Sequence, residues 1–101
     1  MEYDLNAVRE AVLKQQVSYR GRKVYKDIAN LGYTLDDVTA CLSYLTAKDY
    51  RKTERYSDAV FDVYIKKTAN KNDQSFDRIF IKLRLIDAEN IEIVEIGSFH
   101  L

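Results

Sequence analysis

Residues 78–85 read RIFIKLRL, and residues 60–66 read VFDVYIK. Apolar and polar side chains alternate in both segments, which is the period of a strand with one buried face. The other face of the two strands is predicted to carry Asp62, Tyr64 and Lys66 together with Phe80, Lys82 and Arg84. Cations beside aromatic rings suit RNA, because its phosphates need charge and its bases need flat surfaces.

The segment before residue 49 has the marks of helices instead. Asp4 can cap a first helix, because its side chain can accept a hydrogen bond from a free backbone amide. Gly32 ends a second helix over about 23–31, and Thr34 with Asp37 forms a capping box that begins a third. Between the first two helices, residues 16–22 are predicted to be a short extended piece, and residues 46–49 one further turn.

The period-two pattern after residue 49 predicts a chain of strands. The predicted elements are strands at 50–56 and 59–66 joined by a turn at 57–58, an exposed mobile loop at 66–77, a strand at 78–86, a turn at 87–90 and a last strand at 91–99 with a bulge or two buried faces at 93–94. The fold class is therefore α+β, with the helices on one face of a mainly antiparallel sheet. We expect a single domain with a helical part at about 4–49 and a sheet part at about 50–100.

Composition excludes several classes of protein. No apolar run approaches the roughly 20 residues of a membrane span, so no membrane contact is expected. The first residues lack the basic start and apolar core of a signal peptide, so a cytoplasmic location is expected. Cys41 is the only cysteine, so the chain has no disulfide or cysteine cluster of its own.

The net charge of zero conceals an uneven distribution of charge. Residues 48–84 carry ten basic against six acidic side chains, whereas residues 85–101 carry four acids and no Lys or Arg. Such separation can concentrate a positive field over the strands even when the total charge cancels. The same counts also fit strand faces that are simply solvated.

The sequence also limits the chemistry that is available. The three glycines do not form a phosphate-binding loop, and one histidine with scattered carboxylates has no metal-site spacing. Cys41 lies in an apolar helical pattern and is assigned to the core, not to a dyad with His100. Acid–base chemistry without a metal or other cofactor remains, and RNA suits it because the 2′-OH can attack the adjacent phosphate itself.

The candidate residues each have a structural alternative. Strand parity places Tyr50, Lys52, Glu54 and Tyr56 on one face of their strand, and the register decides whether that is the face of Lys82 and Arg84. Lys52 can equally be a solvated lysine, and Glu54 a partner of a nearby arginine. His100 can be a frayed terminal residue. If Phe99 anchors the last strand, however, His100 faces the opposite side, and histidine is the side chain best suited to titrate near neutrality.

Several motifs resemble the MqsR family of type II toxin–antitoxin toxins. They are LTAKDYRK at residues 45–52, YSD at 56–58, DVY at 62–64, IFIKL at 79–83 and SF at 98–99. The resemblance implies a RelE-like fold and a sequence-selective, metal-independent endoribonuclease that cuts mRNA. It also implies a cognate antitoxin protein as partner.

The resemblance matches only one of the family's four functional positions. Lys52 corresponds to the family's first functional lysine. His100 stands in place of a lysine, Phe80 in place of a tyrosine and Phe61 in place of a glutamine. We therefore expect that catalytic roles have moved within the site, with His100 as general acid and Glu54 or Lys52 as base.

The predicted site is built from two sets of residues, with no metal ligand among them. The catalytic residues are Lys52, His100 and Glu54, and the substrate-binding residues are Arg55, Tyr56, Tyr64, Lys66, Phe80, Lys82 and Arg84. The expected partners are mRNA and the antitoxin, with the ribosome as a further candidate. The alternative is a non-catalytic module of the same shape that binds RNA, the ribosome or a protein.

Overall fold

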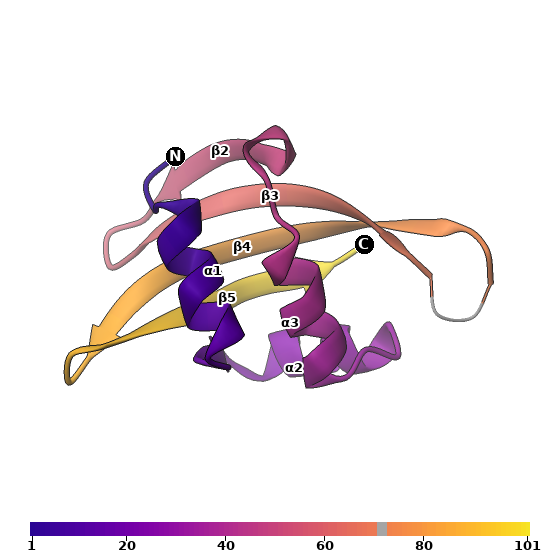
Figure 1. Ribbon diagram of the computed structural model, residues 1–101, viewed down its shortest axis with the longest axis horizontal. Helices are drawn as coiled ribbons and strands as arrows, with labels where there is room; N and C mark the ends of the chain where they lie inside the picture. Colours follow the sequence, from indigo (N-terminus) through magenta and orange to yellow (C-terminus); the bar gives the residue numbers. More distant parts are fainter. Residues whose placement is uncertain (71–72) are drawn as a thin grey trace.

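The structure is a computed structural model that describes residues 1–70 and 73–101. The chain forms three helices, a short 3₁₀ turn, η1, and five strands (Figure 1). The first strand lies between the first two helices, and the other four strands follow η1. The helical elements are α1 (Leu5–Leu13), α2 (Arg22–Asn30), α3 (Leu35–Ser43) and η1 (Ala47–Asp49). The strands are β1 (Val17–Tyr19), β2 (Tyr50–Arg55), β3 (Val60–Ala69), β4 (Phe76–Ala88) and β5 (Ile91–His100).

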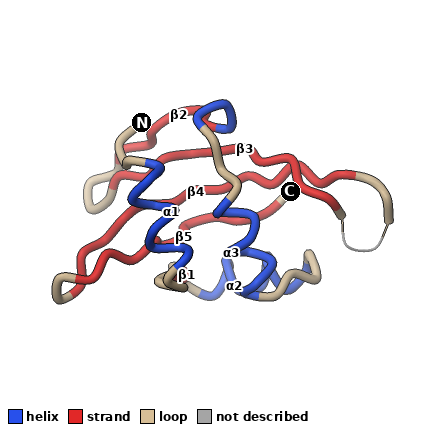
Figure 2. Tube along the Cα trace, in the orientation of Figure 1, coloured by secondary structure: helices blue, strands red, loops and turns tan. Residues whose placement is uncertain are grey.

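The five strands form one sheet in the order β1-β5-β4-β3-β2. Every neighbouring pair is antiparallel except β1 with β5, which is parallel. Helices α1 and α3 lie across one face of the sheet, and α2 packs at the end where β1 and β5 lie (Figure 2). The prediction of an α+β fold, with helices on one face of a mainly antiparallel sheet, is confirmed.

The helix ends follow the predicted capping chemistry. The Asp4 side chain accepts a hydrogen bond from the backbone amide of Asn6 at 3.1 Å. Thr34 and Asp37 form the capping box, in which each side chain accepts from the other's backbone amide, at 3.2 and 2.7 Å. Gly32 has a φ of +76°, which is the left-handed conformation that ends a helix at little cost for glycine.

Strands β3 and β4 are longer than the sequence predicts, β2 ends one residue earlier than predicted, and the irregularity of β5 lies elsewhere. The loop expected at 66–77 is too long, because β3 continues to Ala69 and β4 begins at Phe76. Lys71 and Asn72, within that prediction, lie outside the described residues. The bulge expected at 93–94 is wrong, because the register slips at Gly97, which has no partner between the pairs Lys82–Ser98 and Leu83–Ile96.

The core lies between the helices and one face of the sheet. Its fully buried strand residues are Ile79, Ile81 and Leu83 of β4 and Val94, Ile96 and Phe99 of β5. The helices contribute Val8, Val12, Val38 and Leu42. Cys41 belongs to this core as predicted, and its burial raises the pKa of its thiol to about 11.

Asp62 is a fully buried carboxylate on the helix-covered face of β3. It accepts hydrogen bonds from the backbone amides of Glu2 and Tyr3, each at 2.9 Å. It also accepts one from the Thr53 hydroxyl of β2 at 2.7 Å. Burial of a carboxylate is costly unless donors surround it, and these three donors replace the lost water. Asp62 therefore fastens both the N-terminal segment and β2 to β3.

The faces of β3 are the reverse of those predicted. Directly opposed residues in an antiparallel pair share a face. Tyr64 opposes Ile81 and Asp62 opposes Leu83, so both lie on the buried face and not beside Lys82. Lys66, which opposes Ile79, lies on that face too. The hydropathy pattern misleads here because Asp62 and Lys66 have polar partners on this face, the Tyr64 side chain is part of the core, and the apolar residues of the other face are covered.

We expect Asp62→Ala to lower the free energy of unfolding by about 3 kcal/mol, because three buried donors lose their charged acceptor. Asp87→Ala is the matched control, since Asp87 is exposed near the end of β4, and it should change stability by no more than about 0.5 kcal/mol. Urea denaturation of both variants measures the difference. Equal effects of the two substitutions would contradict the role assigned to Asp62.

Candidate active site

The face of the sheet that the helices leave open collects most of the predicted site. One row of cross-strand neighbours runs over it, from Lys52 through Val63 and Lys82 to Ser98. Lys82 alternates with Ile81 and Leu83, which are in the core, so this row points away from the helices. The bulge between Tyr50 and Lys52 turns Tyr50 to the buried face and leaves Lys52 and Glu54 on the open one.

A charged cluster occupies the middle of this open face. Glu54 Oε1 lies 3.1 Å from Lys82 Nζ, and Glu54 Oε2 lies 4.0 Å from Lys52 Nζ. Lys82 donates a hydrogen bond to the Tyr56 hydroxyl at 2.8 Å, and that hydroxyl donates to Glu54 Oε2 at 3.3 Å. One carboxylate, two ammonium groups and one phenol are thus held together from β2, the residue that follows it, and β4.

The cluster favours the ionised forms of Glu54 and Lys82. The hydrogen bond from Lys82 lowers the pKa of Glu54, against the opposing effect of burial and with help from the charges of Lys82 and Lys52. The hydrogen bond with Tyr56 raises the pKa of Lys82, and Glu54 adds to the effect. At neutral pH the cluster therefore offers an ionised acceptor directly beside a cation.

A second group surrounds the ring of Phe61. The guanidinium carbons of Arg20 and Arg84 lie 5.4 and 5.6 Å from the centre of that ring. Glu95 Oε1 holds both arginines, at 3.5 Å from Arg20 and 2.9 Å from Arg84. Asp58 contacts Arg20 at 3.0 Å. Two guanidinium groups are thus matched by two carboxylates.

His100 lies beside Phe80, its cross-strand partner on the open face. The two rings stack with centroids 5.2 Å apart and an angle of 18° between their planes. The Nδ1 atom is 2.9 Å from the carbonyl oxygen of Leu101, and because a carbonyl only accepts, this contact places a proton on Nδ1. His100 is therefore held in a defined orientation and is not a frayed end.

Comparison with known protein families identifies the family of this chain. A family model described as "Motility quorum-sensing regulator, toxin of MqsA" matches residues 1–100. The chain belongs to this family. A search of curated proteins finds no match. Membership makes the chain an MqsR-family toxin of a toxin–antitoxin system, with a cognate antitoxin as partner.

The open face of this MqsR-family toxin unites the four positions that the resemblance singled out. Lys52 opposes Val63, Phe61 opposes Glu54, and Phe80 opposes His100, all on the same side. The departures from the family pattern at positions 61, 80 and 100 thus lie on one face of the sheet. Phe80 and His100 stack there, and Phe61 lies four residues along β3 from Ile65, the partner of Phe80.

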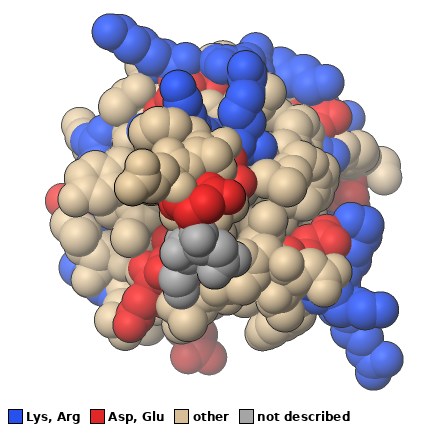
Figure 3. Space-filling model, turned by 90° about the vertical axis from the view of Figure 1, so that its right-hand side faces the viewer, with Lys and Arg blue, Asp and Glu red and all other residues tan. Residues whose placement is uncertain are grey.

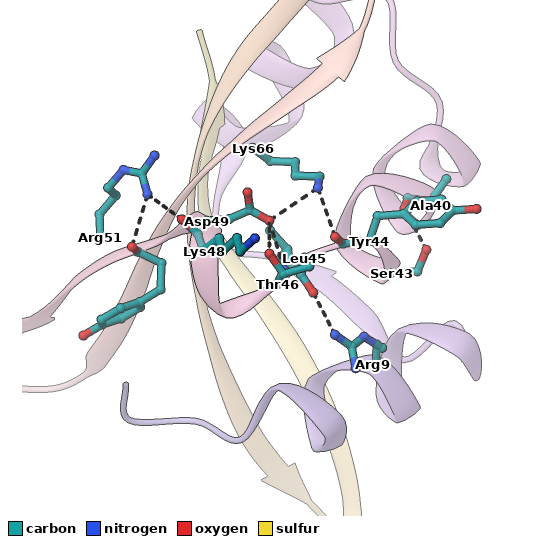
Figure 4. Close-up of polar contacts among 11 residues, drawn as sticks. Arg9, Ala40, Ser43, Tyr44, Leu45, Thr46, Lys48, Asp49, Arg51 and Lys66 are labelled. Carbon is teal, nitrogen blue, oxygen red and sulfur yellow. Dashed lines mark hydrogen bonds and ion pairs between the residues drawn. The ribbon is translucent and has the colours of Figure 1, made fainter.

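Three residues predicted to bind substrate do not join the toxin's open face. Tyr64 is fully buried, and burial raises the pKa of its hydroxyl, which has no hydrogen-bond partner in the described part of the chain. Lys66 points instead toward the carbonyl of Tyr44 at 3.0 Å and the Asp49 carboxylate at 3.4 Å (Figure 4). Arg55 alternates to the other face and pairs with Glu2 at 2.8 Å.

Cations also gather at the edge of the toxin's sheet. Figure 3 shows Lys and Arg side chains along the top of the molecule, the side on which β2 lies in Figure 1. Arg51, Lys52 and Arg55 of β2 are exposed there, as is Lys48 of η1. This edge extends the positive charge beyond the central cluster, so a long anionic strand could follow it.

Sequence reasoning missed part of the site. Arg20 comes from the end of β1, far along the chain from Phe61, and no local pattern predicts their contact. Glu95 and Gly97 were likewise unassigned. The one available signal was the YSD motif, which turns the β2–β3 hairpin and so places Tyr56 and Asp58 beside the open face.

A hollow of about 380 Å³ between β1 and α2 lacks the charged side chains of the open face. It is lined mainly by apolar and tyrosine side chains. Within residues 1–70 and 73–101, no three His, Cys, Asp or Glu side chains are grouped to hold a metal ion. None of the helices in those ranges is long and apolar enough to cross a membrane.

Tyr64→Phe should raise the toxin's free energy of unfolding by about 1 kcal/mol, because it removes a buried hydroxyl that has no partner. Tyr33→Phe is the matched comparison and should lower it by about 1 kcal/mol, since the Tyr33 hydroxyl donates to Asp77 at 3.2 Å. Urea denaturation distinguishes the two signs. A loss of stability in Tyr64→Phe would show that its hydroxyl has a role this structure does not reveal.

The Glu54–Lys82 pair should make stability depend on acid pH. Folding lowers the pKa of Glu54 from its ordinary value of about 4.5. The ionised Glu54 therefore stabilises the fold above pH 4.5, and this stabilisation is lost as the pH falls through the lower pKa of the folded state. The difference in unfolding free energy between the wild type and Glu54→Gln should therefore be constant near neutrality and shrink in acid. Glu92→Gln, at an exposed position of β5, should show no such change, and a constant difference for Glu54→Gln would refute the pairing.

Proposed function

We propose that this toxin is a metal-independent endoribonuclease that cuts mRNA at the open face of its sheet. The observation that supports it most is the Glu54 carboxylate held between Lys82 and Lys52 beside the Tyr56 hydroxyl. In the reaction the ribose 2′-oxygen bonds to the adjacent phosphorus while the bond to the 5′-oxygen breaks. The products are a 2′,3′-cyclic phosphate and a free 5′-hydroxyl.

Glu54 takes the proton from the attacking 2′-OH in this proposal. Its lowered pKa makes it a weak base but keeps it ionised and ready at neutral pH. Lys82 and Lys52 offset that weakness, because negative charge develops on the phosphate oxygens as the 2′-oxygen attacks. Lys82, whose side chain is only 21% exposed, interacts more strongly with that charge than Lys52, which is 62% exposed.

His100 gives a proton to the departing 5′-oxygen. Glu54 opposes Phe61, which contacts Arg84, so it lies on the Arg84 side of Lys82. His100 lies on the other side, opposite Phe80. In-line displacement needs base and acid on opposite sides of the phosphorus, and a phosphate bound at Lys82 would have them there. Because the Nδ1 proton is donated to Leu101, the proton for the 5′-oxygen comes from Nε2, so His100 acts as the imidazolium, which carries a proton on both nitrogens.

A non-catalytic role is the second candidate. Phe80 and Phe61 stand where the family has a tyrosine and a glutamine, and a phenyl ring transfers no proton. The same platform could then bind RNA, the ribosome or a partner protein without cutting. A cytoplasmic site of action follows from either reading, because mRNA and ribosomes are located there.

We expect Glu54→Gln and His100→Ala each to reduce RNA cleavage at least about 100-fold, the typical effect of a lost acid or base. Lys52→Ala should also reduce it about 100-fold, the typical effect of a lost group that stabilises the developing charge. Glu92→Gln is the control for the first, because Glu92 is exposed and away from the cluster. Purified toxin is incubated with cellular mRNA in the presence of a chelator, and new 5′-ends are mapped.

The same variants are also expressed in cells to score growth arrest. Cuts at one short sequence, lost in the three variants while each stays folded by circular dichroism, support the nuclease. Full cleavage by both Glu54→Gln and His100→Ala would exclude the assigned roles. RNA binding without any cleavage by the wild type would favour the binding module.

A further inference from the structure

A hollow next to the charged cluster lies on the same open face. Its volume is about 220 Å³, smaller than the roughly 300–1,000 Å³ of pockets that hold drug-sized ligands. Its lining consists of Arg20, Tyr56, Asp58, Phe61, Lys82 and Gly97. Lys82 belongs both to this hollow and to the Glu54 cluster, so whatever occupies the hollow is adjacent to a phosphate bound at Lys82.

The floor of this hollow depends on Gly97. This residue is the extra one at the bulge of β5, and a Cβ atom there would lie 2.8 Å from Cε1 of Phe61. Any side chain at position 97 would therefore push the Phe61 ring away. With glycine in place, Phe61 lies against the strand and supports the guanidinium of Arg20 above it.

This hollow differs from the phosphate site in its balance of charge. Arg20 is held by Asp58 at 3.0 Å and by Glu95 at 3.5 Å, and Arg84 shares Glu95. The arginine charges are thus balanced by carboxylates and attract a phosphate weakly. The Arg20 guanidinium, whose central carbon lies 5.4 Å from the centre of the Phe61 ring, is itself planar and still offers a surface on which a nucleobase can stack.

We propose that this hollow binds one nucleobase of single-stranded RNA, next to the cleaved phosphate, and that it selects the sequence that is cut. Arg20 is the stacking surface, and the ring of Tyr56, 47% exposed as a residue, closes the side. Asp58, whose side chain is 69% exposed, uses one oxygen for Arg20 and turns the other to the edge of the base. The proposal rests on the proposed function for RNA as the ligand and for the cleaved phosphate beside the base.

Binding of RNA that cannot be cut tests this base site separately from catalysis. The probe is a pool of short random-sequence 2′-O-methyl oligoribonucleotides, in which the 2′-oxygen is blocked. Bound and unbound fractions are sequenced for the wild-type toxin, Arg20→Lys, Asp58→Asn and Arg22→Lys. Arg22 is exposed at the start of α2 and outside the hollow, so its substitution is the matched control.

The wild type should enrich one base at one position. Arg20→Lys keeps the charge but loses the plane, so it should reduce that preference about tenfold and leave the other positions unchanged. Asp58→Asn should change which base is preferred at the same position, because it exchanges an acceptor for a donor. Arg22→Lys should have the same base preference as the wild type. With an abasic ribose at the selected position, the wild type and Arg20→Lys should bind the RNA with equal affinity.

Three results would overturn the base site: an unchanged preference in Arg20→Lys, an equal loss of affinity for all sequences, which marks a phosphate contact, or no binding of the pool. Melting temperatures of the variants ensure that each is folded. Selective binding by a toxin that cuts no RNA would support the base site and reject the nuclease. Cleavage that depends on Glu54 but not on Arg20 would support the nuclease and reject the base site.

Discussion

The antiparallel pairing of β3 with β4 is the constraint on which the rest of this structure depends. It sets Tyr64 opposite Ile81 and Val63 opposite Lys82, and so decides for every residue of both strands whether it faces the helices or the open side. Because side chains alternate, a shift of one residue would exchange the two faces of β3 completely. The core, the charged cluster and the Phe61 group all exist in this register only.

Both faces of β3 contain residues that seem misplaced by their polarity, and each is compensated. On the buried face, Asp62 receives three hydrogen bonds and Lys66 contacts Asp49. On the open face, Phe61 and Val63 are 4% and 1% exposed, although no helix covers them. Arg20 and Arg84 cover the Phe61 ring, because the long stems of charged side chains can shield apolar surface while their charged ends stay in water.

The open face therefore has two halves of different character. Around Glu54, two lysines exceed the single carboxylate, and the surplus positive charge suits a phosphate. Around Phe61, carboxylates balance the arginines, and the surface is flat and nearly neutral. Lys82 lies between the halves. A single-stranded RNA needs both kinds of surface, one for its backbone and one for a base, and here they are neighbours on adjoining strands.

The sequence by itself determined the local elements and the family. Capping residues such as Asp4 and Thr34 act on their own backbone neighbours, so the helix starts were predictable, as were the β2–β3 hairpin and the motifs shared with the MqsR family. The sequence also predicted that Lys52 and Glu54 share one face of their strand, because side chains alternate within a strand, but the register that brings this face to the side of Lys82 was not readable from it.

Only the tertiary structure decided how the strands pair and which distant residues meet. The face of Tyr64 and Lys66 was not predictable, because hydropathy does not reveal that Lys66 meets a carboxylate or that the Tyr64 side chain enters the core. The approach of Arg20 to Phe61 depends on the parallel pairing of β1 with β5 and on the bulge at Gly97. Contacts of that kind are long-range packing events, and the residues near either position in the chain contain no trace of them.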